Sequence, residues 1–120
     1  MISTFYETPF FTRRVAELLD DETYRGLQNE LQVNPAKGAV MPGCGGIRKV
    51  RWDDPSRGKG KRGGWRVIYL HVPETRCMYF VTIYGKDEQD DLDAAQKRQL
   101  RALAEQTKRA LRSRQRPRKG

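Results

Sequence analysis

The chain has 120 residues, of which 37% are hydrophobic and 32% charged, a size and composition typical of one domain and too small for two. Lysine and arginine outnumber aspartate and glutamate by 24 to 15, and the net charge of +9 excludes a generic acidic enzyme surface and indicates a polyanionic partner. No apolar stretch approaches the roughly 20 residues of a membrane span, and the first residues lack the features of a secretion signal, so we expect a cytoplasmic protein.

Residues 2 to 6 form the first expected strand, and Thr8 followed by Pro9 predicts the start of a helix. That helix has an apolar stripe with a period of 3.6 residues, which turns Arg13, Arg14 and Glu17 away from the core. The stripe consists of Phe11, Val15, Leu18 and Leu19.

A second helix is expected between the cap Asp20 and the stop at Asn34-Pro35, antiparallel to the first. Residues 38–46 contain Pro42 and several glycines, so we interpret them as a connection.

From Ile47 the hydrophobic period changes to two, which predicts a strand over residues 47–52. Val50 and Trp52 fall on one strand face, while Lys49 and Arg51 fall on the other. This alternation predicts a half-buried strand whose open face is cationic. Residues 65–72 and 78–84 are rich in aromatic and β-branched side chains, and the turn 73–76 between them indicates a hairpin.

Asp93 and Gln96 have the spacing of a capping box for a last helix, whose apolar stripe ends at Leu111. The order β-α-α-β-β-β-α predicts a small α+β sandwich with an antiparallel-rich sheet, helices on one face and an open basic face. We expect one domain over residues 1–112 and a flexible basic tail over 113–120.

The positive charge is concentrated in two windows. Residues 48–66 carry eight basic side chains against two aspartates, and residues 108–119 carry seven basic side chains and no acid. Concentrated charge is typical of a phosphate-binding surface. For the C-terminal window, a merely solubilising tail explains the composition equally well.

The sequence lacks the residues needed for a zinc site, a disulfide framework or a nucleotide-binding P-loop. One histidine, His71, and two distant cysteines, Cys44 and Cys77, cannot form a zinc site or a disulfide framework, and we interpret all three as structural. The glycine-rich run 58–64 ends in Gly64-Trp65 where a P-loop needs Lys-Ser/Thr. We therefore expect neither a metal nor another cofactor.

The remaining candidates for chemistry are the lysine and arginine side chains. Cleavage of RNA needs a base for the 2′-hydroxyl proton, charge stabilisation at phosphorus and a proton for the leaving oxygen. A lysine crowded by other cations has a lowered pKa, so Lys49 or Lys59 is the expected base. Arg62, Arg66 and Lys86 are candidates for charge stabilisation. Tyr69 and Tyr84 could stack on a base, although packing in the core explains both equally well.

Residues 47–52 (IRKVRW), 58–69 (GKGKRGGWRVIY) and 82–86 (TIYGK) together resemble the HigB branch of the RelE/ParE toxin superfamily. The resemblance extends to about residue 112. It implies a ribosome-dependent endoribonuclease that cuts mRNA in the A site of the 30S subunit without a metal. It also implies neutralisation by a HigA-like antitoxin with a helix-turn-helix domain, and we expect the free chain to be a monomer.

Carried over position by position, the family pattern matches Lys49, Arg51, Arg66 and Lys86, although Asp87 follows where relatives often have another basic residue. The expected catalytic residues are Lys49, Arg51, Lys59, Arg66 and Lys86. The expected RNA-binding residues are Arg48, Lys61, Arg62, Tyr69 and Tyr84.

Two other functions remain open at this point. One is a noncatalytic module that binds nucleic acid through the same charge. The other is a gyrase poison of the ParE type, because relatives with that activity share the fold.

Overall fold

The computed structural model describes residues 2–52, 64–85 and 92–115. Its elements are, in chain order, β1 (Thr4–Glu7), α1 (Pro9–Leu18), α2 (Asp21–Val33), β2 (Ala39–Val40), β3 (Arg48–Trp52), β4 (Trp65–Val72), the 3-10 helix η2 (Pro73–Thr75), β5 (Cys77–Gly85) and α3 (Ala94–Gln115). The predicted order is confirmed, with one addition. Residues 39–40, expected to be part of a connection, form the edge strand β2, which is too short to show a hydrophobic period.

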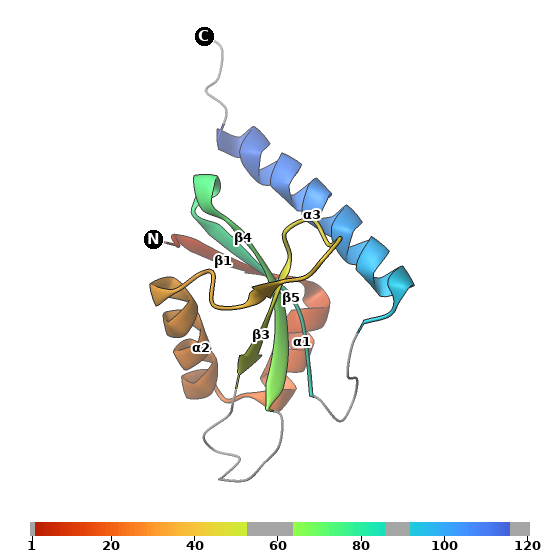
Figure 1. The fold of residues 1–120 in the computed structure, drawn as a ribbon. Coiled ribbons are helices and arrows are strands. Elements are labelled where there is room, and N and C mark those ends of the chain that lie inside the picture. The colour runs from red at the N-terminus through yellow and green to blue at the C-terminus, as the bar shows by residue number, and fades with distance from the viewer. Residues whose placement is uncertain (1, 53–63, 86–91, 116–120) are drawn as a thin grey trace.

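The described strands form one sheet in the order β1-β5-β4-β3-β2 (Figure 1). β1 pairs with β5 in parallel, and the other three pairs are antiparallel, so the expected antiparallel-rich sheet and the β4–β5 hairpin are confirmed. The sheet thus places β3, β4 and β5 side by side.

The predicted caps fix where α1 and α2 begin. The Thr8 hydroxyl accepts a hydrogen bond from the backbone N–H of Phe11 at 3.0 Å, and a carboxylate oxygen of Asp20 accepts one from Thr23 at 2.7 Å. The second bond lowers the pKa of Asp20, because it stabilises the charged form. Each cap satisfies a backbone donor of the first helical turn.

α3 begins with the predicted capping box. The Asp93 N–H donates to Gln96 Oε1 at 2.9 Å, and the Gln96 N–H donates to Asp93 Oδ1 at 2.8 Å. The helix continues past position 112 to Gln115, so it includes the first three residues of the segment 113–120. Arginine and glutamine are good helix formers. In addition, the Arg112 guanidinium forms an ion pair with the Glu74 carboxylate at 3.1 Å, which connects the last turns of α3 to η2. Residues 116–120 lie outside the described part of the chain.

Helices cover both faces of the sheet, contrary to the expected single covered face (Figure 1). β4 and β5 are buried along nearly their whole length, and strands that are apolar on both sides need cover on both faces. The α1/α2 core consists of Ile2, Phe11, Val15, Leu19, Leu27, Leu31, Val50, Trp65, Val67, Tyr69, Met78, Phe80 and Ile83. The α3 core consists of Met41, Cys44, Ile47, Ile68, Leu70, Val72, Cys77, Val81, Tyr84, Leu92, Leu100, Ala104 and Leu111.

β5 contains a bulge at Val81. Phe80 pairs with Tyr69 and Thr82 pairs with Ile68, so Val81 is an extra residue in the ladder. The bulge reverses the alternation of β5. Phe80 therefore faces the α1/α2 core, whereas Tyr84, an even number of residues later, faces the α3 core.

None of the described helices is both long enough and apolar enough to cross a bilayer.

Candidate functional site

The centre of the candidate site is a row of three residues on adjacent strands. Arg51 of β3 lies directly opposite Arg66 of β4, and Arg66 lies opposite Tyr84 of β5. Paired residues share one sheet face, with Cβ atoms about 5 Å apart. We call these three residues the arginine row, and it lies on the face that carries the α3 core.

The two guanidinium groups differ in exposure. Arg51 is exposed, whereas Arg66 is only 5% exposed. Like charges directly opposite each other destabilise a sheet, and a buried charge is costly to desolvate. Two guanidinium groups on one sheet face offer paired N–H donors to an anion, so this arrangement is suited to a phosphate.

Lys49 forms part of the next row on the same face. It lies opposite Ile68, which lies opposite Thr82. Lys49 also lines a recess of about 250 Å³ together with Lys97 of α3 and the segment 39–42. We call this the Lys97 recess. It continues the positive charge from the arginine row toward the β2 edge of the sheet.

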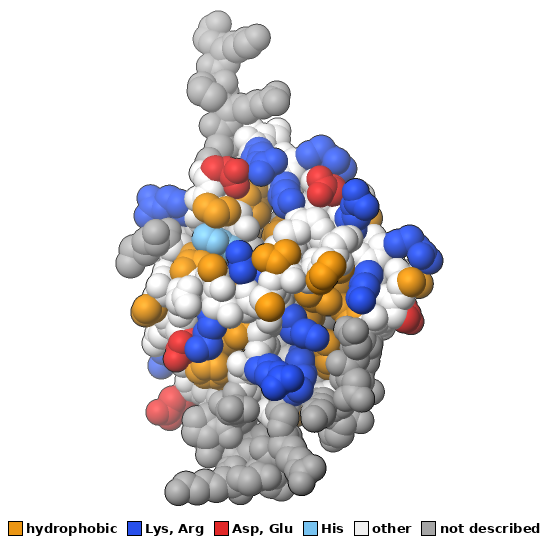
Figure 2. All heavy atoms as spheres, viewed as in Figure 1, with side chains coloured by type: hydrophobic (Ala, Val, Ile, Leu, Met, Phe, Trp, Pro, Cys, Tyr) orange, Lys and Arg blue, Asp and Glu red, His pale blue; other side chains and the backbone are white. Residues whose placement is uncertain are grey.

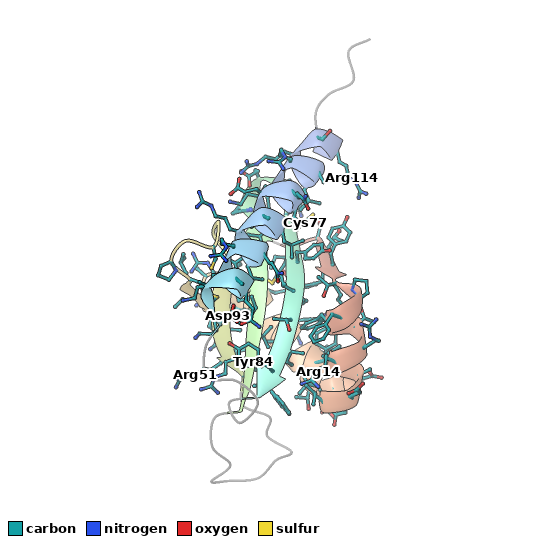
Figure 3. The ribbon with its side chains drawn as sticks, turned by 90° about the vertical axis from the view of Figure 1, so that its right-hand side faces the viewer. Arg14, Arg51, Cys77, Tyr84, Asp93 and Arg114 are labelled. Carbon is teal, nitrogen blue, oxygen red and sulfur yellow. The ribbon has the colours of Figure 1, made fainter. Side chains whose placement is uncertain are left out.

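On the other side of the arginine row, Tyr84 lines a larger recess of about 460 Å³, shared with Phe10 and Arg14 of α1 and Gln96 of α3. We call this the Phe10 recess. In Figure 3, Arg51, Tyr84 and Arg14 follow one another across the lower end of the sheet, below Asp93 at the start of α3. Figure 2 shows Lys and Arg side chains spread over the face it displays, including a group in its lower half.

Sequence reasoning missed Arg14 and Lys97. The helical period predicted that Arg14 faces solvent, but this side chain is half-buried, whereas Arg13 and Glu17 are exposed as expected. Arg14 lines a recess because β5 and the start of α3 pass beside α1, a tertiary relationship that no local pattern contains. Lys97 is one of many basic residues in α3, and nothing in the sequence distinguishes it.

Arg48 belongs to a different surface. It lies opposite Tyr69, a member of the α1/α2 core, and thus on the other face from the arginine row. Its guanidinium donates to the carbonyl of Gly38 at 2.7 Å and to that of Ala36 at 3.4 Å. Arg48 therefore holds the connection between α2 and β2, and the structure does not bring it together with Lys49 and Arg51.

Tyr69 is a core residue. Its ring is 0% exposed, and its hydroxyl donates to the Pro35 carbonyl at 2.7 Å and accepts from the Gly38 N–H at 2.9 Å. Burial raises the pKa of Tyr69. A ring without exposed surface cannot stack on a base, so the expected RNA-binding role of Tyr69 is wrong. Tyr69 faces the α1/α2 core, as the alternative interpretation held.

The remaining expected site residues, Lys59, Lys61, Arg62 and Lys86, lie outside the described residues.

The residues interpreted as structural have internal contacts. Cys44 and Cys77 are buried free thiols that donate to the carbonyls of Pro42 and Thr75. Burial and the charge of Arg48 lower the pKa of His71. Across the described ranges, no three His, Cys, Asp or Glu side chains converge as a metal site would require.

No protein-family model matches the chain. The site must therefore be interpreted from its own geometry.

Proposed function

We propose that this chain is the toxin of a type II toxin–antitoxin pair, of the HigB type, and that it cuts mRNA in the ribosomal A site without a metal ion. The observation that carries this proposal is the arginine row with Lys49 beside it on the same sheet face. Guanidinium groups bind phosphate through paired N–H donors, and an ammonium group can exchange a proton. The same side chains can therefore hold a phosphodiester and act on it.

In the proposed reaction, the Lys49 amine takes the proton of an RNA 2′-hydroxyl. The oxygen then attacks the adjacent phosphorus, and the bond from phosphorus to the 5′-oxygen breaks. Arg51 and Arg66 stabilise the extra negative charge on the phosphoryl oxygens, and Tyr84 supplies a proton to the leaving oxygen. The products are a 2′,3′-cyclic phosphate and a 5′-hydroxyl end, so every proton and bond is accounted for.

The position of Arg66 suits this chemistry. Because Arg66 is 5% exposed, its charge acts in a medium of lower dielectric constant than water, where it stabilises a developing charge more strongly. Arg51, which is exposed, can meet the RNA first. The proposal includes a cytoplasmic location and a HigA-like antitoxin that neutralises the free monomer.

The test uses purified ribosomes, a defined mRNA and the full-length chain. Wild-type protein should produce new 5′ ends within codons only when ribosomes are present. Arg51→Ala should reduce the cutting rate by about a hundredfold, the usual effect of removing one group that stabilises transition-state charge. The matched control is Arg25→Ala, which removes another exposed arginine from α2, on the opposite face of the sheet.

The other outcomes separate the alternatives. Wild-type protein that binds RNA with a steep salt dependence but leaves the message whole is a binding module. Trapped, cleaved DNA in the presence of gyrase identifies a gyrase poison. If Arg51→Ala and Arg25→Ala lose cutting activity equally, the arginine row is not part of the site that cuts RNA.

A further inference from the structure

An exposed aromatic ring stands at the edge of the Phe10 recess. Phe10 is 48% exposed, whereas its neighbour Phe11 is 0% exposed and fills the α1/α2 core. Core packing therefore accounts for Phe11 but not for Phe10. Arg14 follows Phe10 by four residues, so both side chains lie on the same side of α1.

The composition of the recess matches single-stranded nucleic acid. Proteins bind such strands with a positively charged groove and aromatic rings on which bases stack. The Phe10 recess combines Phe10, the guanidinium of Arg14 and the half-buried hydroxyl residue Thr82. Its volume of about 460 Å³ lies within the range of small-ligand sites, roughly 300–1,000 Å³.

The recess is also continuous with the arginine row, because Tyr84 belongs to both. From β3 to β5 is two strand spacings, about 10 Å. An RNA strand that crosses the arginine row at right angles to the strands therefore reaches the recess at Tyr84. This continuity favours a nucleotide over a protein segment as the occupant.

We infer that the Phe10 recess binds a nucleotide next to the cleaved bond, with the base stacked on Phe10 and a phosphate held by Arg14. This inference rests on the proposed function and extends it, because it gives the RNA a direction across the sheet and a place where a base can be selected.

The first test measures stacking. A short single-stranded RNA with one 2-aminopurine base should lose fluorescence when wild-type protein binds, because stacking quenches that base. Phe10→Leu, which keeps the apolar volume but not the aromatic face, should abolish the quenching and weaken RNA affinity about tenfold. Phe10→Tyr should restore both. Val33→Ala is the matched control, since Val33 is an exposed apolar residue at the far end of α2, 87% exposed.

The second test measures the phosphate contact. Arg14→Ala should reduce the slope of log affinity against log salt by about 0.7, the value for one contact to a single strand. Arg13→Ala, which removes the exposed neighbouring charge, should leave the slope nearly unchanged.

The outcomes distinguish the two proposals. If wild-type protein cuts mRNA on ribosomes and Phe10→Leu cuts the same codons with unchanged affinity and quenching, the recess inference is wrong while the proposed function stands. If Phe10→Leu keeps its RNA properties but is no longer neutralised by the antitoxin, the recess is a protein-docking surface, which also overturns the inference. If wild-type protein neither binds nor cuts RNA, both proposals fail.

Discussion

Arg51 and Arg66 stand opposite each other across β3 and β4, on one face of the sheet. Like charges directly opposite each other in a sheet repel. Replacing Arg51 with threonine, a good strand former, should therefore stabilise the protein by roughly 0.2–1 kcal/mol while it lowers RNA cutting. Urea unfolding at low salt gives the free energy of unfolding, and the gain should shrink at high salt.

Arg51→Lys is the control for that experiment, because it keeps the positive charge. Equal free energies of unfolding for Arg51→Thr and Arg51→Lys would contradict the repulsion argument.

Tyr69 and Tyr84 should respond differently to loss of the hydroxyl. Tyr69→Phe leaves the buried N–H of Gly38 without its acceptor, which should cost about 1–3 kcal/mol of stability and leave cutting by the folded protein unchanged. Tyr84→Phe should lower the cutting rate about a hundredfold if its hydroxyl donates the proton to the leaving oxygen. Thermal unfolding and single-turnover cutting on ribosomes measure the two effects. A Tyr69→Phe protein of normal stability and low activity would contradict this assignment.

Two glycines should give opposite results when replaced by alanine. Gly26 lies inside α2, where an added Cβ would come no closer than 3.6 Å to the Trp52 ring, an ordinary contact. Gly26→Ala should therefore stabilise the protein by about 0.5–1 kcal/mol through helix propensity. At Gly38 the added Cβ would lie 2.9 Å from the Lys49 carbonyl oxygen and from the Tyr69 ring, so Gly38→Ala should lower the melting temperature. A melting temperature that rises in both variants would show that the β2 connection can move aside.

His71 should make stability depend on pH. Burial, with the nearby charge of Arg48, lowers the pKa of His71 below its ordinary value of 6.5, so the unfolded chain takes up a proton at a higher pH than the folded one. The contribution of neutral His71 is complete above pH 6.5 and is lost as the pH falls through the folded pKa. His71→Gln should therefore flatten the fall in the free energy of unfolding as the pH drops below 6.5. Parallel curves for the two proteins would contradict this assignment.

Much of the fold follows from local sequence. Thr8, Asp20 and Asp93 mark helix starts because capping acts within one turn, and Lys49 with Arg51 share a face because strands alternate. That helices cover both faces of the sheet depends on tertiary packing. The continuous apolar run of β4 did indicate it, because a strand that is apolar on both sides needs cover on both faces. The Phe10 and Lys97 recesses required the packing of separate elements, which local periodicity does not encode.

The Val81 bulge links the two parts of the proposed RNA surface. The Thr8 hydroxyl donates to the Val81 carbonyl at 2.7 Å, so the helix that carries Phe10 and Arg14 is anchored to the same strand that carries Tyr84. Deleting Val81 would leave a regular ladder with Tyr84 still beside Arg66, yet it would remove the carbonyl that accepts from the Thr8 hydroxyl, one of the two hydrogen bonds from Thr8 to β5. The distance from Tyr84 on β5 to Phe10 and Arg14 on α1 therefore depends on this inserted residue. A change in the length of β5 at this point would change RNA affinity without replacing any residue proposed to contact the RNA.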